Sequence, residues 1–108
     1  MGRRILVVMT NPTDRMDAEF NAWYSNTHVQ EVVGIPGFVS AQRFKLAAEQ
    51  MGGESEYEYL AIYEIDAASA GATLNALKEA RPNLNMTDAL GAKRMMLAYD
   101  QLTDKVTA

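Results

Sequence analysis

The sequence predicts an α+β domain in the order βαββαβ, with a four-stranded antiparallel sheet and two helices on one of its faces. Three observations predict it. Four segments show the apolar runs or two-residue alternation of strands, two show the three- and four-residue spacing of helices, and their order is that of a split βαβ unit. At 108 residues the chain is long enough for one such domain and too short for two.

The first half of the chain predicts a strand, a helix and a turn. Residues 5–9 are continuously apolar, which is typical of a strand buried on both faces. Asp14 is expected to cap a helix that runs to about Val29. Gly34 and the Ile35–Pro36 pair should stop this helix, because a residue before proline is displaced from helical geometry. The apolar face of the helix consists of Met16, Phe20, Trp23, Tyr24 and Thr27.

The second half predicts three strands and one helix. Residues 38–46 and 57–65 alternate as strands, and the glycine- and glutamate-rich residues 47–56 between them predict an exposed loop. Asp66 should cap an alanine-rich helix to about Ala80, with an inner stripe of Ala70, Leu74 and Leu77. Residues 93–102 predict the fourth strand. We therefore treat residues 1–108 as one domain, in which residues 103–108 form a loose tail.

Right-handed crossovers give this ferredoxin-like arrangement the strand order 4-1-3-2. Two helices cover only one face of the sheet, and Tyr57, Tyr59 and Tyr63, with methionines of the fourth strand, are expected on the other face. A large apolar face is seldom left exposed in a monomer. The sequence thus predicts a homodimer, packed sheet to sheet, with a mainly apolar cavity between the sheets and tyrosine hydroxyls inside it.

Composition excludes several functions. The net charge is −4, and the ten Lys and Arg residues are scattered, which argues against nucleic acid or an anionic membrane as a partner. The chain has no cysteine, and its one histidine has no metal-ligand spacing around it, so we expect neither a metal nor another cofactor. The apolar run after Arg4 is too short for a signal sequence, and we expect a cytoplasmic protein.

The sequence resembles the dimeric α/β-barrel superfamily, and within it the EthD-like branch. The resemblance covers residues 4–102 and rests on the motifs F-x-x-W-Y-x-x-x-H (Phe20 to His28), P-G-F (residues 36–38), A-x-R-F (residues 41–44) and Y-L-A-x-Y-E (residues 59–64). It implies a homodimer whose two sheets close into a barrel, and members linked to ether degradation or to aromatic and polyketide metabolism. Some EthD-like relatives have a second histidine shortly after the first. This chain has Gln30 and Glu31 there, which excludes a two-histidine mechanism.

His28 is the expected proton carrier, because histidine alone has an ordinary pKa near neutrality. Tyr24, one turn earlier, could hydrogen-bond His28 or a ligand, and Glu31 could orient the imidazole. The alternative is a structural His28, bonded to backbone carbonyls where the helix ends near Gly34.

Five further residues are predicted to bind substrate: Arg43, Trp23, Tyr63, Tyr59 and Tyr99. Arg43 needs a negative partner, which could be Glu58 or Glu64 in a structural ion pair, or the carboxylate or enolate of a ligand. Trp23 could stack on an aromatic ligand or belong to the core. The tyrosines could line the cavity, pack in the dimer interface, or both.

Three functions remain open. The leading one is cofactor-free proton transfer (isomerisation, cyclisation or a lyase step) on a mostly apolar, aromatic or polyketide-like molecule. The second is cofactor-independent oxygenation of an activated phenol. The third is a non-enzymatic binding or stress-associated module, which a cavity smaller than about 100 Å³ would favour, since usual ligand pockets exceed ~300 Å³.

Overall fold

The computed structural model describes residues 3–108; Met1 and Gly2, with which the predicted domain begins, lie outside the described residues. Its elements follow the predicted order of strands and helices. Short helical segments extend the two main helices at their ends or within them. The elements are β1 (Arg4–Pro12), α1 (Asp17–Trp23), η1 (Tyr24–His28), α2 (Val29–Val33), β2 (Phe38–Lys45), β3 (Tyr59–Ile65), η2 (Ala67–Ser69), α3 (Ala70–Ala80), η3 (Arg81–Asn83) and β4 (Leu90–Asp100).

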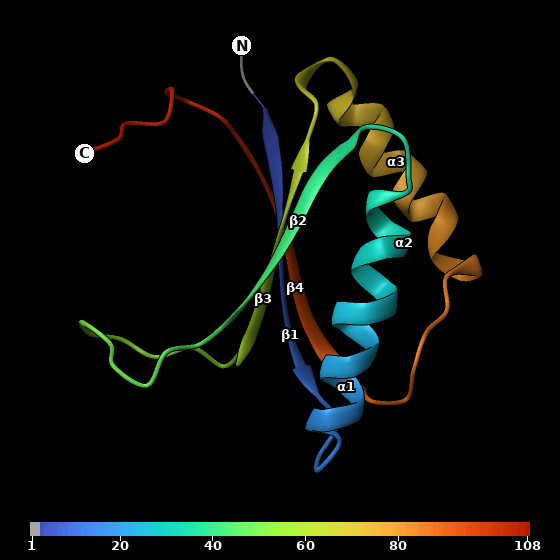
Figure 1. Cartoon of the computed structure of the whole chain (residues 1–108), viewed down its shortest axis with the longest axis vertical. Helices are drawn as coiled ribbons and strands as arrows, with labels where there is room; N and C mark the ends of the chain where they lie inside the picture. Colours follow the sequence, from blue (N-terminus) through green and yellow to red (C-terminus); the bar gives the residue numbers. More distant parts are fainter. Residues whose placement is uncertain (1–2) are drawn as a thin grey trace.

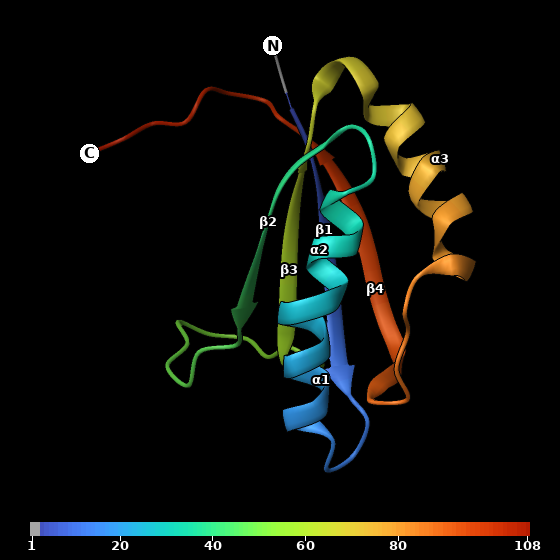
Figure 2. The ribbon, with the colours of Figure 1, turned by 45° about the vertical axis from the view of Figure 1, so that its right-hand side comes forward.

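The sheet has the predicted topology. Its strands are ordered β2-β3-β1-β4, which is the expected 4-1-3-2 order read from the other edge, and every neighbouring pair is antiparallel. Both helices lie on one side of the sheet, whereas the β2–β3 loop and the C-terminal segment extend to the other side (Figure 1). In the turned view α3 lies on the same side as the long helix, which is the continuous run of α1, η1 and α2 (Figure 2). The fold class is therefore confirmed as a ferredoxin-like βαββαβ domain.

The first helix is one continuous run, α1–η1–α2, but its start differs from the prediction. Met16 is the N-cap, and no side chain caps the helix, so the expected Asp14 cap is wrong. Arg15 lies between them in the left-handed region (φ 67°), which prevents helical geometry from beginning before Asp17. The predicted stop is confirmed, because α2 ends at Val33 with Gly34 as its C-cap. The helix runs four residues beyond the expected Val29.

The second helix begins as predicted. The Asp66 side chain accepts a hydrogen bond from the backbone N–H of Ala68 at 3.1 Å, which is the expected cap. Leu77 of the predicted stripe is buried in the core. Thr73 was not predicted, yet it is only 1% exposed, and its hydroxyl donates to the Pro36 carbonyl at 3.3 Å. This contact fastens α3 to the turn between α2 and β2.

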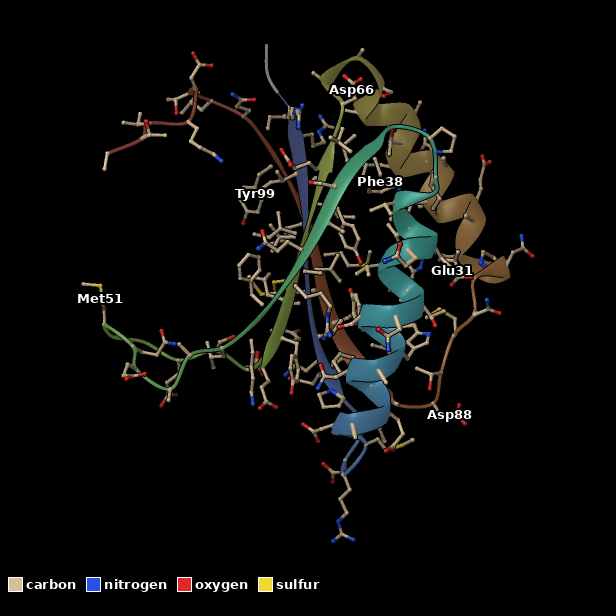
Figure 3. All side chains as sticks on the ribbon, in the orientation of Figure 1. Glu31, Phe38, Met51, Asp66, Asp88 and Tyr99 are labelled. Carbon is tan, nitrogen blue, oxygen red and sulfur yellow. The ribbon has the colours of Figure 1, made fainter. Side chains whose placement is uncertain are left out.

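The assignment of faces requires a correction. Tyr59 and Tyr63 do not lie on the uncovered face; they are buried against the long helix, where Tyr59 packs on Phe20 and Tyr63 meets Tyr24. The two-residue alternation of β3 had separated its faces correctly, but the helices cover the tyrosine side. Tyr99, by contrast, lies on the side away from the helices (Figure 3). The predicted group of tyrosines is thus divided between two faces.

The uncovered face is nearly all apolar. We call it the open face. In β1 its residues alternate with Leu6, Val8 and Thr10, which are buried on the helix side, and residues paired across the antiparallel register lie on the same side of the sheet. The open face consists of Ile5, Val7, Met9, Phe44, Leu60, Ile62, Met95, Leu97 and Tyr99, with Ser40, Gln42 and Glu64 toward one edge.

Strand β4 ends at Asp100, so Leu102, placed in the fourth strand by the sequence, lies beyond it and is 95% exposed. Within residues 3–108, no helix combines the length and the apolar character required to cross a membrane.

Candidate functional site

A cavity lies between the sheet and the helices. Its polar lining comes from the long helix, from β3, and from the α3–β4 region. Its volume is about 40 Å³, room for one or two water molecules. The lining residues are Leu6, Val8, Thr10, Trp23, Tyr24, His28, Val32, Tyr63, Leu77, Arg81, Leu84, Met86, Leu90, Arg94 and Met96. The cavity that the sequence predicts between the sheets of two chains needs a second copy and stays a prediction.

A π-helical turn presents two of the lining residues. Across η1 the backbone N–H of Val29 bonds to the carbonyl of Tyr24, five residues earlier, and this widens the helix. In a regular α-helix, residues five apart point about 140° away from each other. Here the rings of Trp23 and His28 stack, with centroids 4.5 Å apart and planes inclined by 21°. The wider turn therefore places the imidazole against the indole.

His28 has an unsatisfied nitrogen. Its Nδ1 atom is buried and has no hydrogen-bond partner among residues 3–108. Tyr24 contacts the imidazole edge to face, with centroids 4.9 Å apart, and its hydroxyl is bonded elsewhere. The alternative of a His28 held by backbone carbonyls at the helix end is wrong, because the residue lies inside the helix and Nδ1 remains free. A buried polar atom without a hydrogen-bond partner lowers the stability by about 1–3 kcal/mol. Such atoms are rare in native proteins, and a catalytic role is one explanation for them.

The surroundings of His28 keep it neutral. Burial is the main cause that lowers its pKa, to about 4; the positive charges of Arg81, Arg43 and Arg94 lower it further, and the Glu31 carboxylate opposes them. The sequence suggested that Glu31 orients the imidazole, but the structure shows no such contact. The Glu31 carboxylate accepts hydrogen bonds from Asn85 instead, at 3.1 Å from the backbone nitrogen and 2.8 Å from Nδ2. A neutral imidazole has one nitrogen without hydrogen, which can accept a proton at pH 7. It does not carry the second N–H hydrogen that the cation could donate.

Two tyrosine hydroxyls complete the polar lining. The Tyr63 hydroxyl donates to the Tyr24 oxygen at 3.4 Å, which leaves the hydroxyl hydrogen of Tyr24 free for another acceptor. Burial raises the pKa of both phenols. Both hydroxyls therefore stay protonated at neutral pH and act as hydrogen-bond donors.

Arg43 lies behind the cavity wall and does not line the cavity. Its guanidinium donates to Ser25 Oγ at 2.8 Å and to Asn21 Oδ1 at 3.0 Å, and it lies 4.4 Å from the centre of the Tyr24 ring. Among residues 3–108 it has no carboxylate partner, so the expected ion pair with Glu58 or Glu64 is wrong. The β2–β3 register explains this, because Arg43 is paired with Ala61, whose side points to the helices. Arg43 holds Tyr24 in place.

The structure brings four of the seven predicted site residues together: His28, Tyr24, Trp23 and Tyr63 all line the cavity. Tyr59 lies in the same layer, where its hydroxyl accepts from Asn21 Nδ2 at 3.1 Å, but it does not reach the cavity. Tyr99 is on the opposite face of the sheet (Figure 3). The cavity is smaller than the ~100 Å³ that a small aromatic molecule requires, so such a ligand needs side chains to move.

The sequence did not indicate the segment that closes the cavity. Residues 84–89 join η3 to β4 and run beside the long helix (Figure 1), and Leu84 and Met86 line the cavity. Asn85 ties the segment to the helix through two hydrogen bonds. Its backbone N–H donates to the Glu31 carboxylate, and its carbonyl accepts from Trp23 Nε1 at 2.6 Å. We call residues 84–89 the closing segment. Its only sequence signal is apolar residues that alternate with Asn85 in a stretch otherwise typical of a loop.

No group of three or more His, Asp and Glu side chains that could hold a metal ion is found in residues 3–108.

Solved structures share this fold at low sequence identity. An EthD family protein from Bacillus halodurans aligns with a TM-score of 0.62 and 18% identity, over 94% of this chain and 100% of its own. A dimeric ferredoxin-like protein of unknown function from Thermobifida fusca aligns with a TM-score of 0.53 and 13% identity, over 92% and 90%. A mutant of SnoaB, a cofactor-independent oxygenase from Streptomyces nogalater, aligns with a TM-score of 0.52 and 15% identity, over 97% and 95%. The predicted EthD-like, dimeric α/β-barrel type of fold is confirmed.

No curated protein matches the sequence. One family does match, over residues 3–98, from the start of β1 almost to the end of β4. This range includes every residue of the cavity lining. The chain therefore belongs to the family described as "Domain of unknown function (DUF4286)".

Proposed function

We propose that this protein is a cytoplasmic homodimer that binds a mostly apolar, aromatic or polyketide-like molecule in the cavity beside His28 and catalyses proton transfer on it without a cofactor. One observation carries the proposal. A neutral imidazole with an unsatisfied nitrogen, and a phenol with a free hydroxyl hydrogen, line the same mainly apolar cavity. A base beside a hydrogen-bond donor is the arrangement needed to remove a proton next to a carbonyl group.

The roles follow from protonation. His28 is neutral in the free protein, so it acts as the base that takes the proton from carbon. Tyr24 donates its hydroxyl hydrogen to the oxygen on which negative charge develops, and Tyr63 fixes the direction of that donor. Trp23, stacked on His28, keeps the imidazole plane fixed.

Access to the cavity requires movement of the closing segment. Met86 is the proposed gate, because the residue is 48% exposed and unbranched thioether side chains adapt to irregular shapes. Asn85, fastened to Glu31 and Trp23, keeps the segment in place around that moving side chain.

The open face supports the homodimer. Its nine apolar residues form one contiguous surface that neither helix covers, and such surfaces mark interaction sites. The β2–β3 loop, with Met51 at its tip, extends on this same side (Figure 3) and could contact a second copy. We expect light scattering to give the mass of two chains, and Leu97→Lys to give the mass of one. A wild-type monomer at micromolar concentration would contradict the proposed assembly.

Deuterium exchange tests the proposed chemistry without knowledge of the natural substrate. A panel of enolisable aryl ketones and β-dicarbonyl compounds, neutral and acidic, is incubated with the protein in D₂O, and exchange at carbon is followed by NMR. We expect His28→Gln to lose at least about 100-fold in the rate for the best compound. Gln30→Ala, a change at an exposed neighbour on the helix, serves as the control. Equal rates in wild type and His28→Gln would refute the assignment of His28 as base.

Two observations favour other functions. The fold similarity to SnoaB favours oxygenation of an activated phenol; oxygen uptake with such a phenol and no added flavin would identify it. The small volume of the cavity favours a binding module without catalysis. Binding without exchange or oxygen uptake across the panel would support that third function.

A further inference from the structure

Arg94 is an exposed residue on the helix side of the sheet, at the edge of the cavity. In the β1–β4 register it is paired with Thr10, which is buried on the helix side of the sheet, and the next residues of β4 on that side are Met96 and Ala98. Its guanidinium therefore projects from the inner face of the strand to the cavity, which it lines. Because Arg94 and Arg81 are both exposed, their guanidinium groups can stay hydrated where the cavity meets solvent.

Arg81 reaches the same cavity from a different element. It follows the C-terminal end of α3, in η3, and also lines the cavity. Within residues 3–108, neither Arg81 nor Arg94 forms an ion pair, although Arg3 is paired with Glu64 and Arg4 with Asp100. In a chain with 14 acidic and 10 basic residues, two arginines thus converge on one cavity without a carboxylate.

Glu31 is a negative charge near this pair, and it acts on His28 against the arginines. It does not line the cavity and forms no ion pair with Arg81 or Arg94; its oxygens accept hydrogen bonds from Asn85. The remaining lining is apolar apart from the two tyrosine hydroxyls, His28, Thr10 and the indole of Trp23. The two charged side chains of the lining are thus both positive, in a protein whose net charge is −4.

We infer that the molecule bound in this cavity is a carboxylic acid, whose carboxylate is held by the guanidinium groups of Arg81 and Arg94. Its apolar part lies against the leucine and methionine side chains once the closing segment has moved to admit it. Guanidinium groups match the planar geometry of a carboxylate and bind it through paired hydrogen bonds. The inference rests on the proposed function only in that both use the same cavity.

Binding of a carboxylate should be linked to proton uptake by His28. The groups that act on the imidazole are Arg81, Arg43 and Arg94, which lower its pKa, and Glu31, which raises it; Tyr24 faces it without charge. A bound carboxylate places one negative charge beside two of the three arginines. It therefore raises the pKa of His28 and strengthens the imidazole as a base once the ligand is in place.

Benzoate and its neutral isostere benzamide test the inference. Because His28 is the only histidine, its ring signals in the proton NMR spectrum report its pKa directly. We expect saturating benzoate to raise this pKa from about 4 and benzamide to leave it unchanged. The dissociation constant for benzoate should increase at least about tenfold in Arg81→Gln and in Arg94→Gln, as for loss of a charged hydrogen bond. Arg15→Gln, a change at an exposed arginine outside the cavity, should bind as the wild type does.

Circular dichroism of each variant verifies that it is folded, and Arg94→Lys, which keeps the charge but loses the fork geometry, should bind with intermediate affinity. Equal affinity for benzoate and benzamide, wild-type affinity in both Arg→Gln variants, or no binding of benzoate would each overturn the inference. The proposed function is judged separately, because deuterium exchange of neutral ketones that depends on His28 would uphold it even if the carboxylate inference failed.

Discussion

Replacement of Gly37 by alanine should be among the most damaging single changes in this chain. Gly37 lies in the turn between α2 and β2 with φ at +101°, a region that side chains with a Cβ atom rarely adopt. A Cβ atom added there would lie 1.8 Å from Thr73 Oγ1 and 3.0 Å from Thr73 Cβ. Thr73 is 1% exposed and cannot swing into solvent. The substitution therefore strains the backbone and overpacks the contact between the turn and α3.

The two effects can be estimated separately. The left-handed conformation costs about 1–2 kcal/mol for a residue with Cβ, and overpacking of a filled site costs about 1–3 kcal/mol. Together they amount to roughly 2–5 kcal/mol, a large share of the ~5–15 kcal/mol that stabilises a typical domain. With a urea slope of about 2 kcal/mol/M, the midpoint of unfolding should fall by about 1–2.5 M.

Urea unfolding at one fixed protein concentration measures the change, with two controls. Gly71→Ala, in helix α3 where nothing lies within 4 Å of the new Cβ, should instead stabilise the protein by about 0.5–1 kcal/mol. A Thr73→Ala background removes the 1.8 Å contact with Oγ1 but keeps Cβ at 3.0 Å, so Gly37→Ala should cost less there, closer to the backbone part of about 1–2 kcal/mol. A Gly37→Ala midpoint equal to that of wild type, or an undiminished cost in the Thr73→Ala background, would show the reasoning to be wrong.

Three other predictions concern the site. The pKa of His28 is lowered from 6.5 to about 4 in the folded protein. Between these pH values the unfolded chain therefore carries a proton on His28 that the folded protein lacks. The free energy of unfolding should thus decrease as the pH falls from 6.5 toward 4, and His28→Gln should lack this component in pH-dependent unfolding. Arg43→Met removes the cation over the Tyr24 ring and two hydrogen bonds; thermal unfolding should show Tm at least about 4 °C lower, and an unchanged Tm would contradict the proposed support of Tyr24. Glu31→Ala frees Asn85, so the Asn85 amide should exchange with solvent at least about tenfold faster in hydrogen-exchange experiments, whereas Glu79→Ala, an exposed change on α3, should leave it unchanged.

The helix boundaries that the sequence predicted correctly are determined by local chemistry. Asp66 caps its helix because a carboxylate accepts from the next backbone N–H groups wherever the chain turns into a helix. The long helix stops at Gly34 because the following Ile35–Pro36 pair disfavours helical geometry. The Asp14 cap failed for a local reason too, since the left-handed Arg15 delays the helix and no sequence rule requires an arginine to adopt that conformation.

The candidate site was predicted in part. The short spacing from Trp23 to His28 was enough to place these residues and Tyr24 on one helix, and all three line the cavity. The stacking of Trp23 on His28 was not predictable, because it depends on the wider π-helical turn and regular helix spacing would separate the two rings. Arg94 was not predicted as a lining residue, because only the pairing of β4 with β1 determines which face it occupies.

By itself, the sequence determined the order of the elements, the two faces of each strand and the presence of an apolar surface that two helices leave uncovered. Only the tertiary structure decided that the helices cover the side of Tyr59 and Tyr63, which places these tyrosines in the layer between the sheet and the helices, where the cavity beside His28 lies. The physical reason is that alternation gives each strand two sides but says nothing about which side is covered. That choice depends on how well the long helix packs against each side, and Phe20 and Tyr24 pack against the tyrosines.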